Sequence, residues 1–184
     1  MKRLLLITGG ICILTMSVFA EPVIDQNYRL NLTDVDGNTL SNADARFNVV
    51  VLSSKTNSDK ARAVGDRIPD FCLGNADYRM ITVVSFETKH NGAVRAVLRA
   101  AIRHRLDSEA QRLQKRYEEH KIARDAHHDV FAVADFDGAI AGQLDLQPEP
   151  ALFRVFVFGK NGELLKQWND VPSEEELAAA LSQN

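Results

Sequence analysis

The sequence predicts a single α/β domain in which strands and helices alternate around a central mixed sheet. Apolar runs at 49–52, 80–86 and 130–134 have the composition of buried strands, and segments with helical periodicity separate them. The segment 152–168 contains two strand-like stretches around an Asn-Gly pair, a strong hairpin signal. We therefore expect an antiparallel edge hairpin, helices on both faces of the sheet, and a long inserted helix at about 93–122.

The amino terminus has the pattern of a secretory signal. Lys2 and Arg3 precede the uncharged residues 4–19, and the triplet 18–20 fits the small-x-small rule for cleavage. Residues 1–20 are therefore predicted to be a cleaved signal peptide, with an uncleaved membrane anchor as the alternative. The apolar stretch is short for a bilayer core, which favours cleavage. A periplasmic or secreted localisation follows from this prediction.

The remaining residues, 21–184, are predicted to form one domain. A hydrophobic fraction of 45% and a charged fraction of 26% are ordinary for a globular protein. The net charge of −3 argues against nucleic-acid binding. No second apolar stretch approaches membrane-spanning length, so no integral membrane span is expected once the signal is removed.

The first half of the domain contains a strand, a turn and a helix. Residues 28–32 alternate apolar and polar side chains, and Gly37 allows a turn at 34–38. The first buried strand leads into a helix that Asn57 or Ser58 caps and Pro69 stops.

The long helix is predicted from Ala93 to Ile122. Its apolar residues recur mostly at three- and four-residue steps. They are Val94, Val97, Leu98, Ala101, Ile102, Leu106, Leu113 and Tyr117. A break into two helices near 106–108 is an alternative, because Asp107 or Ser108 would cap a second helix.

Turn and capping residues predict the boundaries of the last strands and the last helix. The third buried strand closes with an Asp-rich turn at 135–138. The hairpin strands are predicted at 152–158 and 163–168, and Ser173 caps a final helix whose first turn is acidic.

Several motifs and their order resemble one family. Asp-x-Asp-Gly turns occur at 34–37 and 135–138, and Pro-Glu-Pro at 148–150 precedes a strand and a Gly-x-x-Gly hairpin at 159–162. Over residues 28–182 the chain resembles the thioredoxin superfamily, in particular its exported thiol-reductase and peroxiredoxin-like branches. The order and spacing of the motifs support this resemblance, since no single motif is diagnostic.

The resemblance implies where an active-site face would lie. Pro150 corresponds to the family's cis-proline, with Pro148 as the second choice. The family places its Cys-x-x-Cys motif at the start of the helix after the first buried strand. The predicted binding loop at that place consists of Ser53, Ser54, Lys55, Thr56, Asn57 and Ser58. In the family this face holds an extended peptide beside the cis-proline, which implies an exported protein or peptide as the partner.

The loop contains no cysteine, since no cysteine lies between Cys12 and Cys72. Only Cys72 would remain after signal cleavage. Dithiol exchange needs both an attacking and a resolving thiol, so one molecule of the mature chain could not perform it. We therefore expect a non-catalytic binding module without a cofactor. The alternative is a single-thiol redox or peroxide-reacting enzyme that uses Cys72, although the flanking Phe71 and Leu73 indicate a buried thiol.

Two further groups of residues have weaker implications. Arg95, Arg99 and Arg103 share one face of the long helix, which is either solvated or a docking surface for an acidic partner or an anionic membrane. The adjacent His127 and His128 do not form a zinc signature, because neighbouring side chains on a strand point to opposite faces. No metal site is expected.

Overall fold

A five-stranded mixed sheet forms the centre of the protein. The computed structural model describes residues 21–86, 88–146 and 152–182. The strand order is β5-β4-β3-β6-β7, with β3, β4 and β5 parallel and with β6 antiparallel to both β3 and β7. The strands are β3 (Phe47–Ser54), β4 (Tyr78–Ser85), β5 (Phe131–Asp135), β6 (Phe153–Phe158) and β7 (Leu164–Trp168).

A separate antiparallel pair precedes the sheet, and helices connect the strands. The pair consists of β1 (Asn31–Thr33) and β2 (Thr39–Ser41). The α-helices are α1 (Ser58–Asp66), α2 (Gly92–Glu119), α3 (Ala139–Gln143) and α4 (Glu174–Leu181). Three short 3-10 helices are η1 (Lys55–Asn57), η2 (Asp70–Cys72) and η3 (Ala126–His128).

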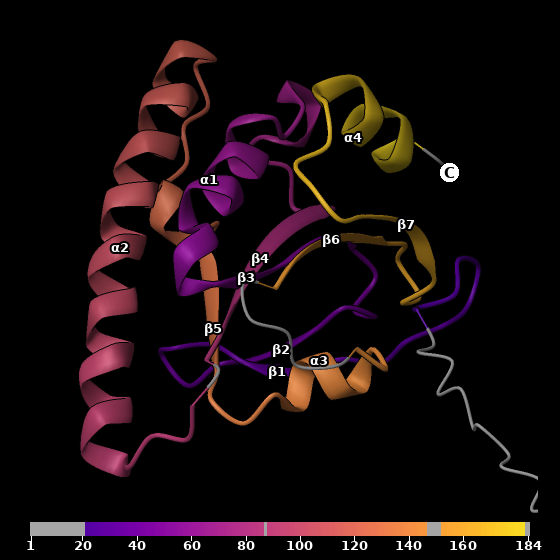
Figure 1. The fold of residues 1–184 in the computed structure, drawn as a ribbon. Coiled ribbons are helices and arrows are strands. Elements are labelled where there is room, and N and C mark those ends of the chain that lie inside the picture. Colours follow the sequence, from indigo (N-terminus) through magenta and orange to yellow (C-terminus); the bar gives the residue numbers. More distant parts are fainter. Residues whose placement is uncertain (1–20, 87, 147–151, 183–184) are drawn as a thin grey trace, which may run out of the picture.

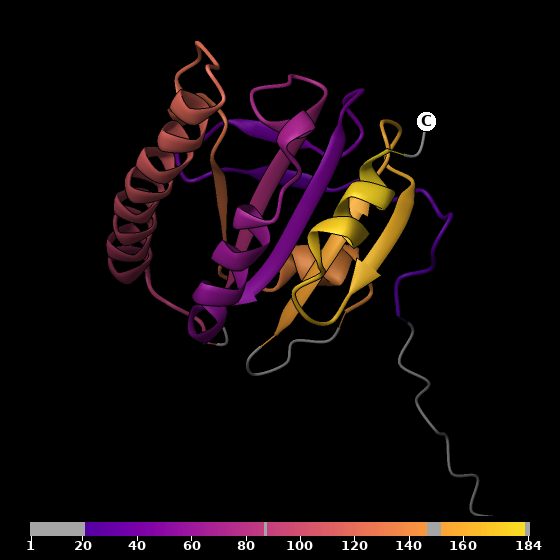
Figure 2. The same ribbon diagram turned by 90° about the horizontal axis from the view of Figure 1, so that it is seen from above.

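The helices cover the two faces of the sheet unequally. Helices α1, α2 and α4 lie side by side on one face, and α3 lies with β1 and β2 on the other (Figures 1 and 2). Helices α1 and α4 pack on Val49, Val51 and Val155 through an apolar cluster that includes Val64 and Leu177. On the opposite face, side chains from β1, β2 and α3 pack on Val50, Leu52 and Phe156. Successive strand residues therefore serve two different cores, as the pleat of a sheet requires.

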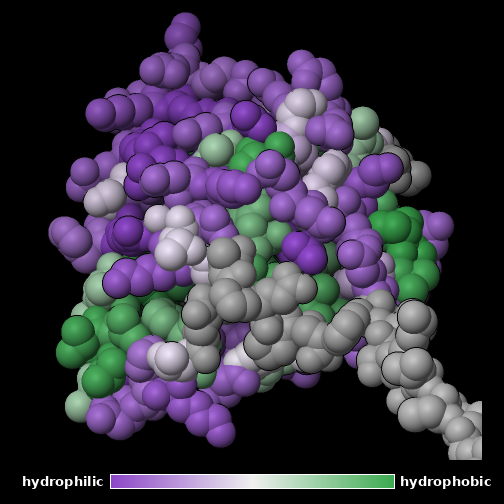
Figure 3. All heavy atoms as spheres, viewed as in Figure 1, coloured by the Kyte–Doolittle hydropathy of each residue, from purple (hydrophilic) through white to green (hydrophobic). Residues whose placement is uncertain are grey.

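The predicted strands and helices are present in the predicted order, but the sequence analysis did not predict β2. The long helix is a single helix without a break near residue 106. Its predicted apolar stripe is wrong at its amino-terminal end, where Val94 and Val97 are 40% and 69% exposed. Green spheres mark this exposed apolar area over the start of α2 in Figure 3. The sequence analysis also missed α3, whose five residues are too few to display a helical period.

The predicted signal peptide lies outside the described residues, as does Pro150. Within the described ranges, no helix is both long and apolar enough to span a bilayer, although α2 has 28 residues.

Arg79 joins the β1–β2 pair to the central sheet. Its side chain is buried on β4 and donates from Nε and Nη2 to Asn48 Oδ1, at 3.0 and 2.8 Å. Its guanidinium also donates to the Ser41 carbonyl and pairs with Asp44 at 3.0 Å. Burial lowers the pKa of the guanidinium, and the nearby carboxylate opposes this shift. A buried cation is tolerated here because its guanidinium donates to an amide oxygen and a carbonyl oxygen and pairs with a carboxylate.

Replacing Arg79 with Met should therefore destabilise the fold. Arg79→Met retains the apolar stem but leaves the buried Asn48 amide oxygen without its donor, which costs about 2 kcal/mol of unfolding free energy. Urea denaturation would measure the loss. Arg46→Met is the matched control, because Arg46 is 3.9 Å from the same Asp44 carboxylate and exposed; its effect should stay within about 0.5 kcal/mol. Equal effects of the two changes would contradict the role given to Arg79.

Candidate functional site

The predicted binding loop lies at the carboxyl end of the central strand. Ser53 and Ser54 are the last residues of β3 and are buried. The Ser54 and Thr56 hydroxyls are 2.8 Å apart, and Asn57 Nδ2 donates to Ser54 Oγ at 3.3 Å. The Ser54 amide donates to the Leu152 carbonyl at 2.9 Å. Lys55 is exposed and Ser58 begins α1. The loop is thus bonded to itself and to the start of the β6 segment.

Cys72 lies apart from this loop, at the end of η2 after α1. Its thiol is 7% exposed and belongs to the apolar cluster beneath α1 and α4. Burial raises the pKa of the Cys72 thiol to about 12. A nucleophilic cysteine needs a lowered pKa and solvent access, and Cys72 has neither. These properties give no support to the single-thiol enzyme alternative.

The three arginines predicted as a docking surface face the two Asp-rich turns. Arg95 binds Asp137 through both terminal nitrogens, at 2.6 and 3.1 Å. Arg103 Nε donates to Asp36 at 2.7 Å, one helical turn beyond Arg99. Arg99 makes no ion pair in the described part of the chain and instead lies over the Phe136 ring, 5.4 Å from its centroid. Two of the three cations are therefore already neutralised by this chain, and their docking role stays a prediction.

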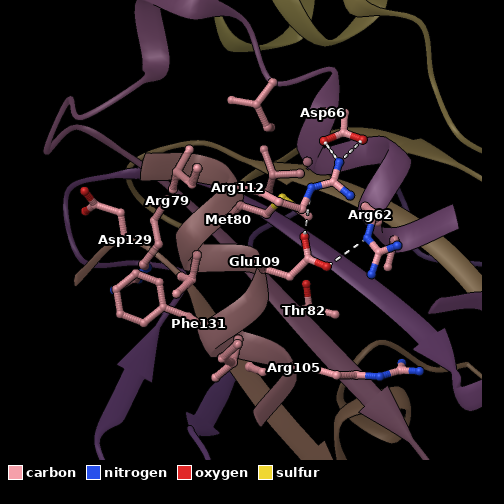
Figure 4. Close-up of a pocket in the computed structure, with 18 of the residues that line it drawn as sticks. Arg62, Asp66, Arg79, Met80, Thr82, Arg105, Glu109, Arg112, Asp129 and Phe131 are labelled. Carbon is pink, nitrogen blue, oxygen red and sulfur yellow. Dashed lines mark hydrogen bonds and ion pairs between the residues drawn. The ribbon is translucent and has the colours of Figure 1, made fainter. Parts of the chain in front are cut away.

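A groove lies between α1 and α2, above β4 (Figure 4). We call it the interhelical groove, and its volume is about 680 Å³. Its floor is made by Met80, Thr82 and Val84 of β4. Its walls include Ala61 and Gly65 of α1, and Leu98, Ile102, Leu106 and Leu113 of α2.

The groove opens toward the predicted binding loop. Ser53, Ser54, Lys55 and Ser58 all line it. The sequence analysis found these residues through the family resemblance, but not the groove itself. Nothing in the sequence signals the groove, because it exists only through the relative position of two helices.

The groove exists because ion pairs, rather than interlocking apolar side chains, join α2 to α1. Arg62 Nε lies 2.8 Å from Glu109, and Arg112 Nη2 lies 2.7 Å from Asp66. Figure 4 shows both pairs spanning the space between the two helices. The long charged side chains leave room beneath them. As a result, the floor residues of β4 are only partly buried, although β4 lies between two other strands.

The charge of the lining differs from that of the chain. In the described structure the lining includes nine Arg or Lys side chains and four Asp or Glu side chains. The groove is therefore cationic in a protein whose net charge is −3. Arg46, Arg62, Arg79, Arg112, Arg116 and Arg124 form ion pairs. Lys55, Arg105 and Lys115 form none among the described residues.

No cluster in the described ranges has the three His, Cys, Asp or Glu side chains needed to hold a metal ion. The adjacent His127 and His128 lie in η3 rather than on a strand. His128 lies 3.9 Å from Asp125 and is largely exposed.

Comparison with known proteins identifies the fold. No family model matches the sequence, and no curated protein matches it. Among solved structures, the exposed lipoprotein thioredoxin of Streptococcus pneumoniae is 15% identical, with a TM-score of 0.51 over 83% of this chain and 97% of that one. The C-terminal domain of a candidate thiol-disulfide oxidoreductase from Bacteroides thetaiotaomicron is 12% identical, with a TM-score of 0.53 over 90% of this chain and 100% of that one. A candidate electron transport protein from Aquifex aeolicus is 14% identical, with a TM-score of 0.52 over 86% of this chain and 96% of that one. The chain thus has the thioredoxin-like fold, which confirms the resemblance at the level of architecture.

Cys72 should resist thiol reagents in the folded protein. With a pKa of about 12, only about one thiol in ten thousand is ionised at pH 8. The modification rate with a chromogenic disulfide reagent should therefore rise with the fraction of unfolded protein in a urea series. Fast modification without urea would show that the thiol is accessible and would support the alternative of a single-thiol enzyme that uses Cys72.

The pairing of Arg95 with Asp137 should be visible as a pH effect. The hydrogen bond from Arg95 lowers the pKa of the Asp137 carboxyl. This pair contributes stability above the unfolded pKa of about 3.9 and loses it as the pH falls through the lower folded pKa. Arg95→Gln should raise the pKa of Asp137 toward its ordinary value in a carboxyl-carbon NMR titration. Arg99→Gln is the matched control and should leave that pKa unchanged, because Arg99 has no carboxylate partner among the described residues.

Proposed function

We propose that this thioredoxin-like protein is an exported binding protein without disulfide-exchange activity and that it holds its ligand in the interhelical groove. The groove is the observation that supports the proposal most directly. Its volume of about 680 Å³ lies within the range of roughly 300–1,000 Å³ typical of small-molecule sites. Its lining combines apolar side chains, such as Met80, Val84 and Leu106, with the charged side chains counted above, so it offers both apolar contact and polar groups that would orient a ligand.

The absence of redox chemistry is proposed from the positions of the cysteines. The predicted binding loop presents hydroxyl, amide and amine side chains where the fold's oxidoreductases have thiols. Cys72 lies in the core, and no second cysteine follows residue 20. Exchange requires one thiolate to attack and a second thiol to resolve the mixed disulfide. This chain has no pair of thiols for that sequence of steps once its predicted signal is removed.

The groove and the predicted binding loop belong to one surface. Ser53, Ser54 and Lys55 form the end of the groove that lies at the carboxyl edge of the parallel strands. Ligands of open α/β sheets bind at this edge, because loops rather than strands surround it. The proposal therefore retains the former active-site face and extends it along α1.

An extended peptide beside Pro150 stays a prediction, because that residue lies outside the described ranges. The same holds for export, which depends on residues 1–20. A partner protein that contacts the loop is compatible with a ligand in the groove.

Filling the groove should abolish binding of an apolar probe. Thr82→Phe places an aromatic ring on the floor of the groove. The fluorescence of the uncharged dye N-phenylnaphthylamine should report binding to the unmodified protein, and its affinity should fall at least about tenfold in the variant, a change of about 1.4 kcal/mol. Thr39→Phe is the control, since Thr39 is exposed on β2, away from the groove.

Thermal unfolding would show that both variants are folded. Unchanged dye binding in Thr82→Phe, or no binding to the unmodified protein, would refute the groove as the site. Measurable reduction of insulin disulfides by the protein would refute the non-redox part of the proposal.

A further inference from the structure

The interhelical groove is long. Its lining follows α2 from Leu98 to Glu119, a length of roughly 30 Å at about 1.5 Å per residue. Its floor is formed by Met80, Thr82 and Val84 of β4, with Phe131 and Ala132 of the neighbouring β5 also in the lining. A groove of this length accommodates an extended linear chain. Met80 on the floor adds a flexible side chain that adapts to apolar ligands.

The ion pairs between the helices locate Arg105 along the groove. Glu109 pairs with Arg62, and Arg112 pairs with Asp66, so the two helices run in the same direction with matched turns. One turn earlier, Arg105 is level with the start of α1. Figure 4 shows Arg105 extending from α2 across the groove, below Thr82, with its guanidinium pointing away from its own helix.

Arg105 is a guanidinium without a carboxylate partner among the described residues, unlike Arg62 and Arg112 on the same groove. Lys55, at the carboxyl end of β3, is a second lining cation that forms no ion pair in the described structure. A guanidinium binds a carboxylate through two parallel hydrogen bonds, which are among the strongest in proteins. Arg105 and Lys55 thus place positive charge that the described residues do not neutralise near the start of α1, and Lys115 adds a third such cation ten residues farther along α2.

We propose that the groove binds a single-chain amphiphile with an anionic head, of the long-chain carboxylate type. The carboxylate binds Arg105, with Lys55 adding positive charge, and the alkyl chain lies on Met80, Thr82 and Val84 beneath α2. This assignment rests on the proposed function, because it names the ligand class for the same groove. Charge complementarity supports it, since the lining is cationic and the chain as a whole is acidic.

Three probes with the same twelve-carbon chain would test the charge of the head group. Isothermal titration of the full chain, as processed by the producing cells, would use dodecanoate and dodecyltrimethylammonium below their micelle-forming concentrations and 1-dodecanol below its solubility limit. Dodecanoate should bind at least about tenfold more tightly than the other two, because a charge-assisted hydrogen bond contributes about 1.5–3 kcal/mol. Equal affinities for the three probes would overturn the anionic head.

Variants of Arg105 would test the position of the head group. Arg105→Gln should weaken dodecanoate about tenfold and leave 1-dodecanol unchanged. Arg105→Lys should retain an intermediate affinity, because it keeps the charge but loses the planar fork. Arg99→Gln is the matched control on the same helix, outside the groove lining, and should change neither affinity. An unchanged dodecanoate affinity in a folded Arg105→Gln protein would overturn the assignment.

Two further arms separate this inference from the proposed function. If the neutral dye binds in a Thr82-dependent way but dodecanoate does not displace it, the ligand class is wrong and the groove remains a binding site. If the dye does not bind at all, both proposals fail.

Cosedimentation with phosphatidylglycerol vesicles distinguishes a lipid surface from a free chain. Binding to vesicles without binding of free dodecanoate would overturn the single-chain assignment.

Discussion

The attachment of α2 by arginines is the interaction on which the rest of this face depends. Arg95 and Arg103 join the helix to the two Asp-rich turns, and Arg112 and Arg116 join it to α1 and η2. Only Ile102, Ala110 and Tyr117 of the helix are buried. Exposed ion pairs are individually weak and are screened by salt. Ile102 packs on Ala132 of β5 with Leu106 beside it, and the ion pairs hold the rest of the helix at several points along its length.

The interhelical groove is a consequence of this mode of attachment. Closely packed helices fill the space above a strand, as α1 does over Val49 and Val51. Above Met80 and Thr82 the connection between α1 and α2 is made by long charged side chains, and a hollow remains below them. The same feature that weakens packing therefore provides the site that we propose.

The fold and the proposed function separate clearly in this protein. The thioredoxin-like fold is associated with thiol chemistry in the solved structures that it resembles. This chain has the sheet and a helix after its central strand, and Cys72 lies in the core. Because function depends on the residues of a site rather than on the architecture, a binding role on this scaffold is consistent with the fold.

Local chemistry in the sequence determined the elements of this protein. The pleated apolar runs predicted the sheet strands, and Ser173 with Glu176 forms the capping box that begins α4. The sequence alone also shows that residues 53–58, the predicted binding loop, contain no cysteine. Only the tertiary structure decided that Val97 is exposed and that Arg79 is buried, because a residue's periodicity does not say which element covers it. The groove depends on ion pairs between residues about 46 positions apart, such as Arg112 and Asp66, and no local pattern encodes that pairing.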